Sequence, residues 1–191
     1  MVRKGYIIFI VSVLGILMLS FSESSQLKIP YKKIDKTVKK QFGLQDFLLQ
    51  QIERISNPYS GSEILNIQSD TFVIGYVFVR RVNSCRMGGC SITPGDAAVE
   101  FEYFDYYLLT DSTGKVLVVK VFNYQATHGH EVMSKGWLKQ FVGFDGTQNL
   151  IYGKDIQAIS GATISAKSII EDIKNAEEQI QKMLGDYVSI H

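Results

Sequence analysis

The chain has 191 residues, enough to bury the core of one domain and a short addition. Its 20 lysines and arginines nearly balance 19 aspartates and glutamates, so the net charge is +1. Nucleic-acid binding usually needs a clustered basic face, and the lysines between residues 32 and 40 are few enough to be a solvated helix face. The composition therefore argues against nucleic acid as a partner.

The N-terminal segment combines positive charge with an apolar run. Arg3 and Lys4 precede an uncharged stretch from Tyr6 to Phe21, as in export signals and membrane anchors. The stretch is long for a signal-peptide core and shorter than the ~18 residues expected of a membrane span. We predict that residues 1–22 are a signal peptide or membrane anchor, and that the remaining chain is extracytoplasmic, in the periplasm or on the outer face of the inner membrane. A poor cleavage sequence around Phe21 favours an anchor.

Residues 23–58 are predicted to form a linker and two helices. Three apolar residues recur four apart: Ile34, Val38 and Phe42. This spacing predicts an amphipathic helix over Tyr31–Phe42, ended by Gly43. A second helix is predicted from Gln45 to Ile55, before a break at residues 57–61.

Residues 59–191 are predicted to form an α+β domain. From Glu63 the pattern becomes typical of strands, which we place at Thr71–Val79, Ala98–Leu109 and Lys115–Tyr124. The second of these has four apolar residues on one face: Val99, Phe101, Tyr103 and Tyr107. The turn at residues 111–114 predicts that the last two strands pair antiparallel.

Two cysteines, Cys85 and Cys90, flank a Gly-Gly loop. In an exported chain this arrangement most simply forms a structural disulfide. A redox-active or metal-binding pair is the alternative, but the four-residue spacer differs from thioredoxin-like sites and two thiolates do not complete a zinc site.

Two histidines, His128 and His130, lie two residues apart, a spacing from which both could reach one metal ion. The sequence offers no obvious further ligands. Trp137 and Phe141 follow, four apart on a predicted short helix, a spacing more typical of core residues than of cofactor contacts.

A long amphipathic helix is predicted after Ser160-Gly161-Ala162-Thr163, with Gly185 closing it. The first turn of a helix presents unpaired N–H groups and partial positive charge, which together favour a phosphate. Gly161 and Ala162 would let the phosphate come close, and the hydroxyls of Thr163 and Ser165 would point at it. Alternatively, Ser160, Thr163 or Ser165 is only an N-cap.

The segment from Ile156 to Ser165 resembles the flavinylation motif of the FMN-binding domain family, found in subunits of the Rnf and sodium-pumping NADH:quinone oxidoreductase complexes and in small extracytoplasmic proteins. The resemblance implies that Thr163 carries FMN through a phosphoester, installed by a flavin transferase from FAD. It also implies that the His128–Glu131 loop lies near the isoalloxazine ring. Gln157 stands where the family usually has an aspartate.

The expected function is electron transfer through covalent FMN, with membrane or extracytoplasmic redox partners. Such a protein is expected to be an electron carrier or a subunit of a redox complex, in preference to a stand-alone enzyme. The predicted cofactor-binding residues are Gln157, Ser160, Gly161, Ala162, Thr163, Ser165, His128, His130 and Trp137. The alternatives are a domain that binds flavin or another phosphate ligand non-covalently, and a structural envelope protein without cofactor. A reductase is less favoured because no Gly-x-Gly-x-x-Gly follows a strand.

Overall fold

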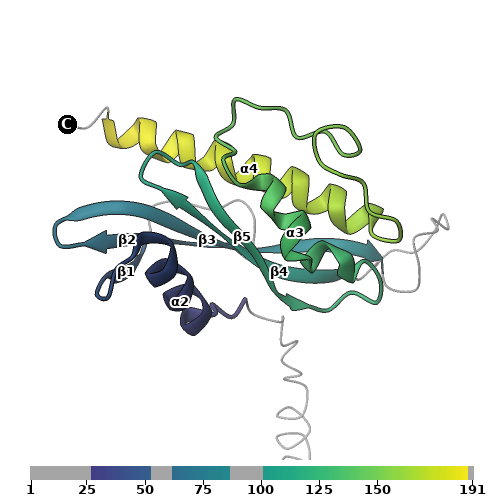
Figure 1. Ribbon diagram of the computed structural model, residues 1–191, viewed down its shortest axis with the longest axis horizontal. Coiled ribbons are helices and arrows are strands. Elements are labelled where there is room, and N and C mark those ends of the chain that lie inside the picture. Colours follow the sequence, from purple (N-terminus) through teal and green to yellow (C-terminus); the bar gives the residue numbers. More distant parts are fainter. Residues whose placement is uncertain (1–26, 53–61, 87–100, 189–191) are drawn as a thin grey trace, which may run out of the picture.

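The computed structural model describes residues 27–52, 62–86 and 101–188, and within them an antiparallel sheet lies between helices (Figure 1). The strands pair in chain order: β1 (Leu48–Gln51), β2 (Ser62–Ser69), β3 (Phe72–Arg86), β4 (Phe101–Asp111) and β5 (Val116–Tyr124). The helices are α2 (Tyr31–Phe42), α3 (Lys135–Leu138) between short 3-10 turns η1 (His130–Met133) and η2 (Lys139–Phe141), and α4 (Thr163–Val188). The predicted α+β class with an antiparallel sheet is confirmed.

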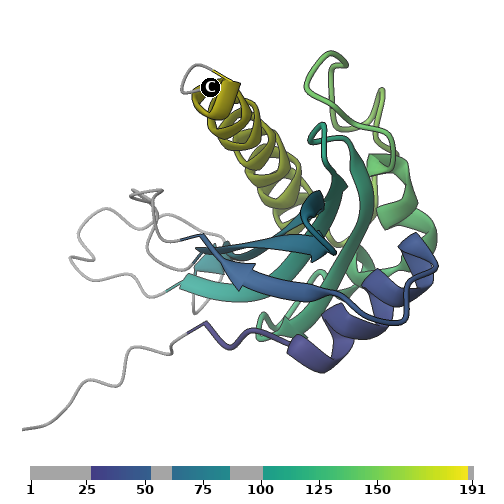
Figure 2. The ribbon, with the colours of Figure 1, turned by 90° about the vertical axis from the view of Figure 1, so that its left-hand side faces the viewer.

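Helices α2 and α4 cover opposite faces of the sheet (Figures 1 and 2). Successive residues of a strand point to opposite faces, and β4 is apolar on both. Phe104, Tyr106 and Leu108 pack in the core beneath α4, whereas Tyr107 and Leu109 pack in the core beneath α2. The sheet therefore separates two cores, and the one beneath α4 is the larger.

Helix α2 forms as the sequence predicts. Ile34 and Val38 are buried against the sheet, and lysines occupy much of the other side. Gly43 ends the helix with φ 69°, a left-handed conformation that glycine adopts without a Cβ clash, and its N–H donates to the Lys39 carbonyl.

The predicted helix over Gln45–Ile55 is wrong, because residues Leu48–Gln51 form β1. Leu49 is paired with Ile67 of β2, and it packs with Phe47 into the core beneath α2 while Leu48 is exposed. Burial thus alternates from one residue to the next, as expected of a strand at the edge of a sheet. Pairing with β2 outweighs the weak helical preference of so short a segment.

Within the described residues the other strand predictions are confirmed, with shifted ends, and the predicted start at Ala98 lies outside these residues. The β3 strand runs from Phe72 to Arg86, well beyond the predicted end at Val79, because it pairs with both β2 and β4. The β4–β5 hairpin forms at the predicted turn, where the Asp111 carboxylate accepts hydrogen bonds from the N–H and hydroxyl of Thr113.

Helix α4 differs from the prediction at its C-terminal end. It begins at Thr163 but continues through Gly185 to Val188. A glycine inside a helix lowers the stability of the helix by only about 1 kcal/mol relative to alanine. The helix can therefore continue past the exposed Gly185.

Two predictions concern residues that the structure does not describe. Residues 1–26 lie outside the described residues, and so does Cys90, the predicted partner of Cys85 at the end of β3. The N-terminal anchor and the disulfide thus stay predictions. None of the helices in the described segments is long and apolar enough to span a membrane.

Candidate functional site

The predicted motif lies at the start of α4. Gly161 has φ 80°, and the turn it makes brings the chain into the helix, which begins at Thr163. Ala162 is buried and its carbonyl accepts the first helical hydrogen bond, from Ala166. Thr163 is exposed. The motif thus presents its threonine to solvent on a helix start that is fixed from beneath by Ala162.

The first turn of α4 carries three backbone donors, beginning with the N–H of Thr163. Among the described residues, the N–H groups of Thr163, Ile164 and Ser165 donate no hydrogen bond to another residue. A Cβ built on Gly161 would meet no atom within 4 Å. An anion could therefore approach these donors, and the residues fit a phosphate at Thr163.

The N-cap alternative does not hold for any of the three hydroxyl residues. Because α4 begins at Thr163, the N-cap position is Ala162, whose side chain has no hydroxyl. Ser160 is exposed in the turn before it, and Ser165 lies within the first turn. The hydroxyls of this motif are therefore not explained by helix capping.

Ser165 has a different environment from the one the sequence suggests. Its side chain is only 2% exposed, and its hydroxyl is 2.7 Å from that of Ser84 on β3 and 3.0 Å from that of Tyr124 on β5. These bonds join α4 to two strands. Ser165 therefore positions the helix start, and its hydroxyl faces the interior, in contrast to the exposed side chain of Thr163.

The loop carrying His128 and His130 packs against this first turn. The Tyr124 hydroxyl donates to the His128 carbonyl at 2.5 Å, and the Tyr124 ring lies 4.6 Å from the His130 ring. Gly129, with φ 89°, passes so close that a Cβ there would lie 2.5 Å from the Ser165 hydroxyl oxygen. The fold thus brings the predicted loop and the predicted motif together, as the sequence prediction requires.

Tyr124 was missed by sequence reasoning, and so was Ser84. Tyr124 ends a strand and reads there as an ordinary aromatic strand residue, and Ser84 carries no motif. Burial raises the pKa of Tyr124, while hydrogen bonds from Ser165 and Ser84 oppose the rise. The phenol stays protonated near neutral pH and serves as a donor to the loop carbonyl.

Trp137 and Gln157 meet through the backbone. The Trp137 indole N–H donates to the Gln157 carbonyl at 2.8 Å, and the Gln157 N–H donates to the side-chain oxygen of Gln140. Trp137 is 6% exposed and packs edge-on against Phe141. Trp137 therefore is a core residue that holds the segment leading to the motif, while the Gln157 side chain is exposed.

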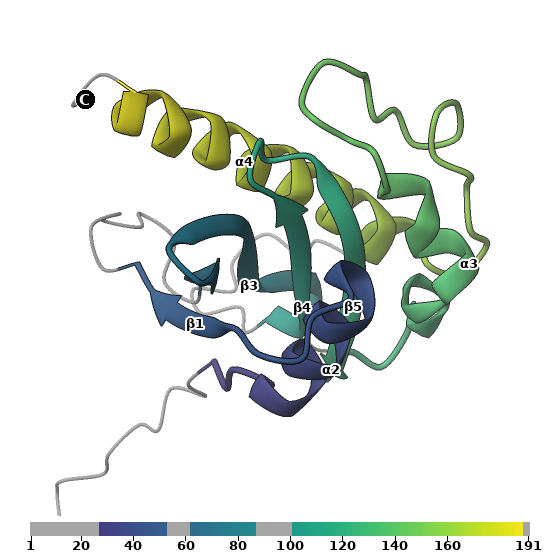
Figure 3. The same ribbon diagram turned by 60° about the vertical axis from the view of Figure 1, so that its left-hand side comes forward.

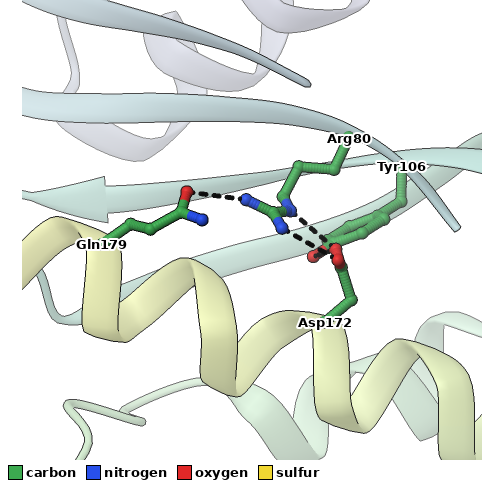
Figure 4. Close-up of polar contacts among 4 residues, drawn as sticks. All are labelled: Arg80, Tyr106, Asp172 and Gln179. Atoms are coloured by element: carbon green, nitrogen blue, oxygen red, sulfur yellow. Dashed lines mark hydrogen bonds and ion pairs between the residues drawn. The ribbon is translucent and has the colours of Figure 1, made fainter. Parts of the chain in front are cut away.

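A buried charge cluster fixes α4 to the sheet (Figure 4). The Arg80 guanidinium, 2% exposed, donates two bonds to the Asp172 carboxylate, at 2.7 and 2.9 Å, and a third to Gln179. The Tyr106 hydroxyl donates to the same carboxylate at 2.7 Å, and burial holds the pKa of this phenol well above its usual value. Because these bonds have fixed geometry, they set the rotation of α4 and with it the direction of Thr163.

The alternative that His128 and His130 bind a metal ion would need further ligands. Among the described residues, no group of three or more His, Cys, Asp or Glu side chains could hold a metal ion. His130 contacts Tyr124, and both histidines are exposed.

Comparison with known protein families identifies the segment that holds this site. Residues 105–178 match the family model of the FMN-binding domain. This segment belongs to the FMN-binding domain family. The resemblance drawn from the motif is thereby confirmed. Among curated proteins, none matched the chain.

The match begins in β4 and ends in α4, so it includes β5, the histidine loop, α3 and the motif of the FMN-binding domain. It does not include β3, although Ser84 and Arg80 of that strand contact α4. Two contacts that support the site therefore come from outside the matched segment.

Proposed function

We propose that this protein is an extracytoplasmic electron carrier whose FMN is joined to Thr163 by a phosphoester bond. The observation that carries the proposal is the exposed Thr163 hydroxyl among unpaired backbone N–H groups, inside the segment that matches the FMN-binding domain family. When bound, FMN supplies one- or two-electron transfer.

The attachment step exchanges the phosphoanhydride bond of FAD for a phosphate ester bond to Thr163. The Thr163 oxygen attacks the phosphorus of FAD that belongs to its FMN half, and a new O–P bond forms. The pyrophosphate P–O bond breaks, and AMP leaves with the electron pair. The threonine proton passes to a base of the flavin transferase, which is the partner needed for maturation.

Residues of this chain would then hold the group. The N–H groups of Thr163, Ile164 and Ser165 can donate to phosphate oxygens, and the absent side chain of Gly161 leaves room for them. The His128–His130 loop, held on the first turn by Tyr124, is close enough to shield or tune a flavin there.

A covalent bond suits a protein outside the cytoplasm. Free FMN is scarce there, so an equilibrium site would be empty by mass action. The apolar run from Tyr6 to Phe21 after Arg3 and Lys4 supports export, and we propose that this run tethers the domain to the membrane near its redox partners. A reporter phosphatase fused after His191 should be active.

The attachment is tested by producing the full chain together with a flavin transferase and measuring its intact mass and peptide map. We expect FMN on the peptide that contains Thr163. Thr163→Val keeps the β-branched shape and removes the hydroxyl, so the fold should persist while the flavin is lost. Thr163→Ser is the matched control, because it retains an oxygen at the same position.

Flavin retained by Thr163→Val, or mapped to another peptide, would refute the assignment.

A second candidate is non-covalent FMN binding, which Gln157 favours because it replaces the usual aspartate of the motif. Flavin released by denaturant would support this candidate. Gln157→Asp should preserve or increase covalent loading if Gln157 weakens recognition by the transferase.

A further inference from the structure

A cluster of lysines lies on the side of the molecule away from α4. The segment from Leu27 to Leu44 carries six: Lys28, Lys32, Lys33, Lys36, Lys39 and Lys40. All six are exposed, and Asp35 is the one acidic residue of this segment. Asp35 forms an exposed ion pair with Lys39 at 3.3 Å, so five positive charges remain uncompensated within the segment.

The folded chain adds lysines from two other elements. Lys33 donates to the Phe122 carbonyl of β5, and Lys120 of β5 donates to the Thr37 hydroxyl of α2 at 2.7 Å. Figure 3 shows α2 against β5, with α3 beyond it. Helix α3, which begins at Lys135, contacts β5. The pKa of Lys120 is lowered, first by burial and then by repulsion from Lys135, Lys40 and Lys36.

We call Lys33, Lys36, Lys40, Lys120 and Lys135 the basic patch. Lys33, Lys36 and Lys40 share one side of α2, because a helix turns once every 3.6 residues. The fold adds Lys120 and Lys135 to the lysines of α2, so the patch is larger than the helix face seen in the sequence. Repulsion between the lysines is a cost to folding that an anionic partner would relieve.

The chain itself limits how far the basic patch can lie from the apolar run. Leu27 and Ile29 pack against the core beneath α2, so the chain is fixed to the domain from Leu27 onward. Only five residues separate Leu27 from Phe21, the end of the apolar run, so the connection has six Cα–Cα steps. A fully extended chain covers at most about 3.4 Å per residue, which limits this connection to roughly 20 Å.

We propose that the basic patch docks on anionic phospholipid headgroups, so that α2 faces the bilayer and α4 lies on the far side of the sheet. The proposal rests on the membrane tether of the proposed function. Such a tether holds the start of α2 within about two Debye lengths of the headgroups. Tyr31, 52% exposed at the first position of α2, is an aromatic residue of the kind that favours the membrane interface.

The test uses the full chain in vesicles of phosphatidylcholine, with and without phosphatidylglycerol. Vesicle flotation reports the tether, and amine-reactive footprinting read by mass spectrometry reports each lysine. We expect Lys33, Lys36, Lys40 and Lys135 to be several-fold less reactive in the anionic vesicles than in the neutral ones. Lys154 and Lys182, exposed elsewhere, should react equally in both. Salt of about 1 M, where the Debye length is ~3 Å, should abolish the difference.

Two variants that each lose three positive charges distinguish an effect of the basic patch from an effect of net charge. K36Q/K40Q/K135Q removes three exposed charges of the patch, and K115Q/K154Q/K182Q removes three exposed charges elsewhere. Each lysine near an anionic surface favours binding by on the order of fivefold, so the first variant should lose the protection of Lys33. The second variant should retain that protection.

Three results would overturn the proposal. Equal reactivity of the patch lysines in neutral and anionic vesicles would exclude lipid charge as the cause. Protection in native membranes but not in lipid vesicles would instead identify an acidic protein as the occupant. Failure of the chain to float with either vesicle would remove the tether, and the docking with it, while leaving the FMN assignment to its own mass measurement.

Discussion

The two faces of the sheet differ in the interactions that their residues make. The face beneath α4 holds buried polar groups, including the ion pair of Arg80 with Asp172 and the Ser165 hydroxyl network. The face beneath α2 packs apolar residues and has a buried hydroxyl contact between Thr37 and Tyr107. Its ion pair, between Arg81 of β3 and Asp105 of β4, lies within the sheet. The ion pair beneath α4 thus joins the helix to the sheet, whereas the ion pair on the other face joins two strands, and α2 is held mainly by hydrophobic burial.

The largest effect is expected from breaking the charge cluster beneath α4. Arg80→Ala leaves the largely buried Asp172 carboxylate without its cation, which should lower the free energy of unfolding by about 3–5 kcal/mol. Lys174→Gln is the control, because its ion pair with Glu171 on the same helix is more exposed and worth at most ~0.5 kcal/mol. Chemical denaturation of both variants measures the difference, and similar losses would mean that α4 is not held by the cluster.

The contact between the histidine loop and α4 is tested next, with two glycines of similar conformation. Gly129→Ala and Gly153→Ala both place a Cβ at a positive φ, which costs about 1–2 kcal/mol. Only the Cβ at Gly129 would also collide with Ser165 and Tyr124, and such overpacking adds about 1–3 kcal/mol. Thermal unfolding should therefore rank Gly129→Ala as the less stable variant, and equal losses would contradict the close approach.

On the α2 face, the corresponding test is Thr37→Val. The Thr37 hydroxyl is 2.8 Å from the Tyr107 hydroxyl and accepts from Lys120. Replacing it with a methyl group of similar size should cost about 1–2 kcal/mol, through the polar groups left unpaired. This loss should be smaller than that of Arg80→Ala in the same denaturation assay. A larger loss would reverse the contrast between the faces.

The smallest effect concerns the pH dependence of Glu177, a buried residue of α4. Burial raises its pKa, repulsion from Asp145 and Glu178 adds to the rise, and a hydrogen bond from Gln181 opposes it. A raised pKa in the folded state means that the protonated carboxyl favours folding at low pH, and that this support is lost as pH rises through the folded pKa.

Glu177→Gln should therefore raise the unfolding temperature near pH 7 and change it little near pH 4. Glu178→Gln, at an exposed neighbouring position, is the control and should show a weaker dependence on pH. Calorimetry at the two pH values decides the matter. A stabilisation by Glu177→Gln that is equal at both pH values would rule out titration of this carboxyl as the cause.

Local patterns in the sequence were enough for several elements. The spacing of Ile34 and Val38 predicted α2, the turn at Asp111 predicted the β4–β5 hairpin, and the motif predicted a helix start at Thr163. Each depends on residues a few positions apart, whose preferences are strong and agree with one another. The family of residues 105–178 could be inferred for the same reason, since its motif is a continuous segment.

The tertiary structure decided what distant residues do to one another. Residues 48–51 have too few local preferences to choose helix or strand, and pairing with β2 makes them a strand. Ser165 reads as a phosphate ligand in the motif, but Ser84 and Tyr124, 81 and 41 residues earlier, turn its hydroxyl inward. The direction of Thr163, the position of the histidine loop and the meeting of Lys120 with α2 all depend on contacts across the sheet, because hydrogen bonds and packing between elements leave no periodic trace in the sequence.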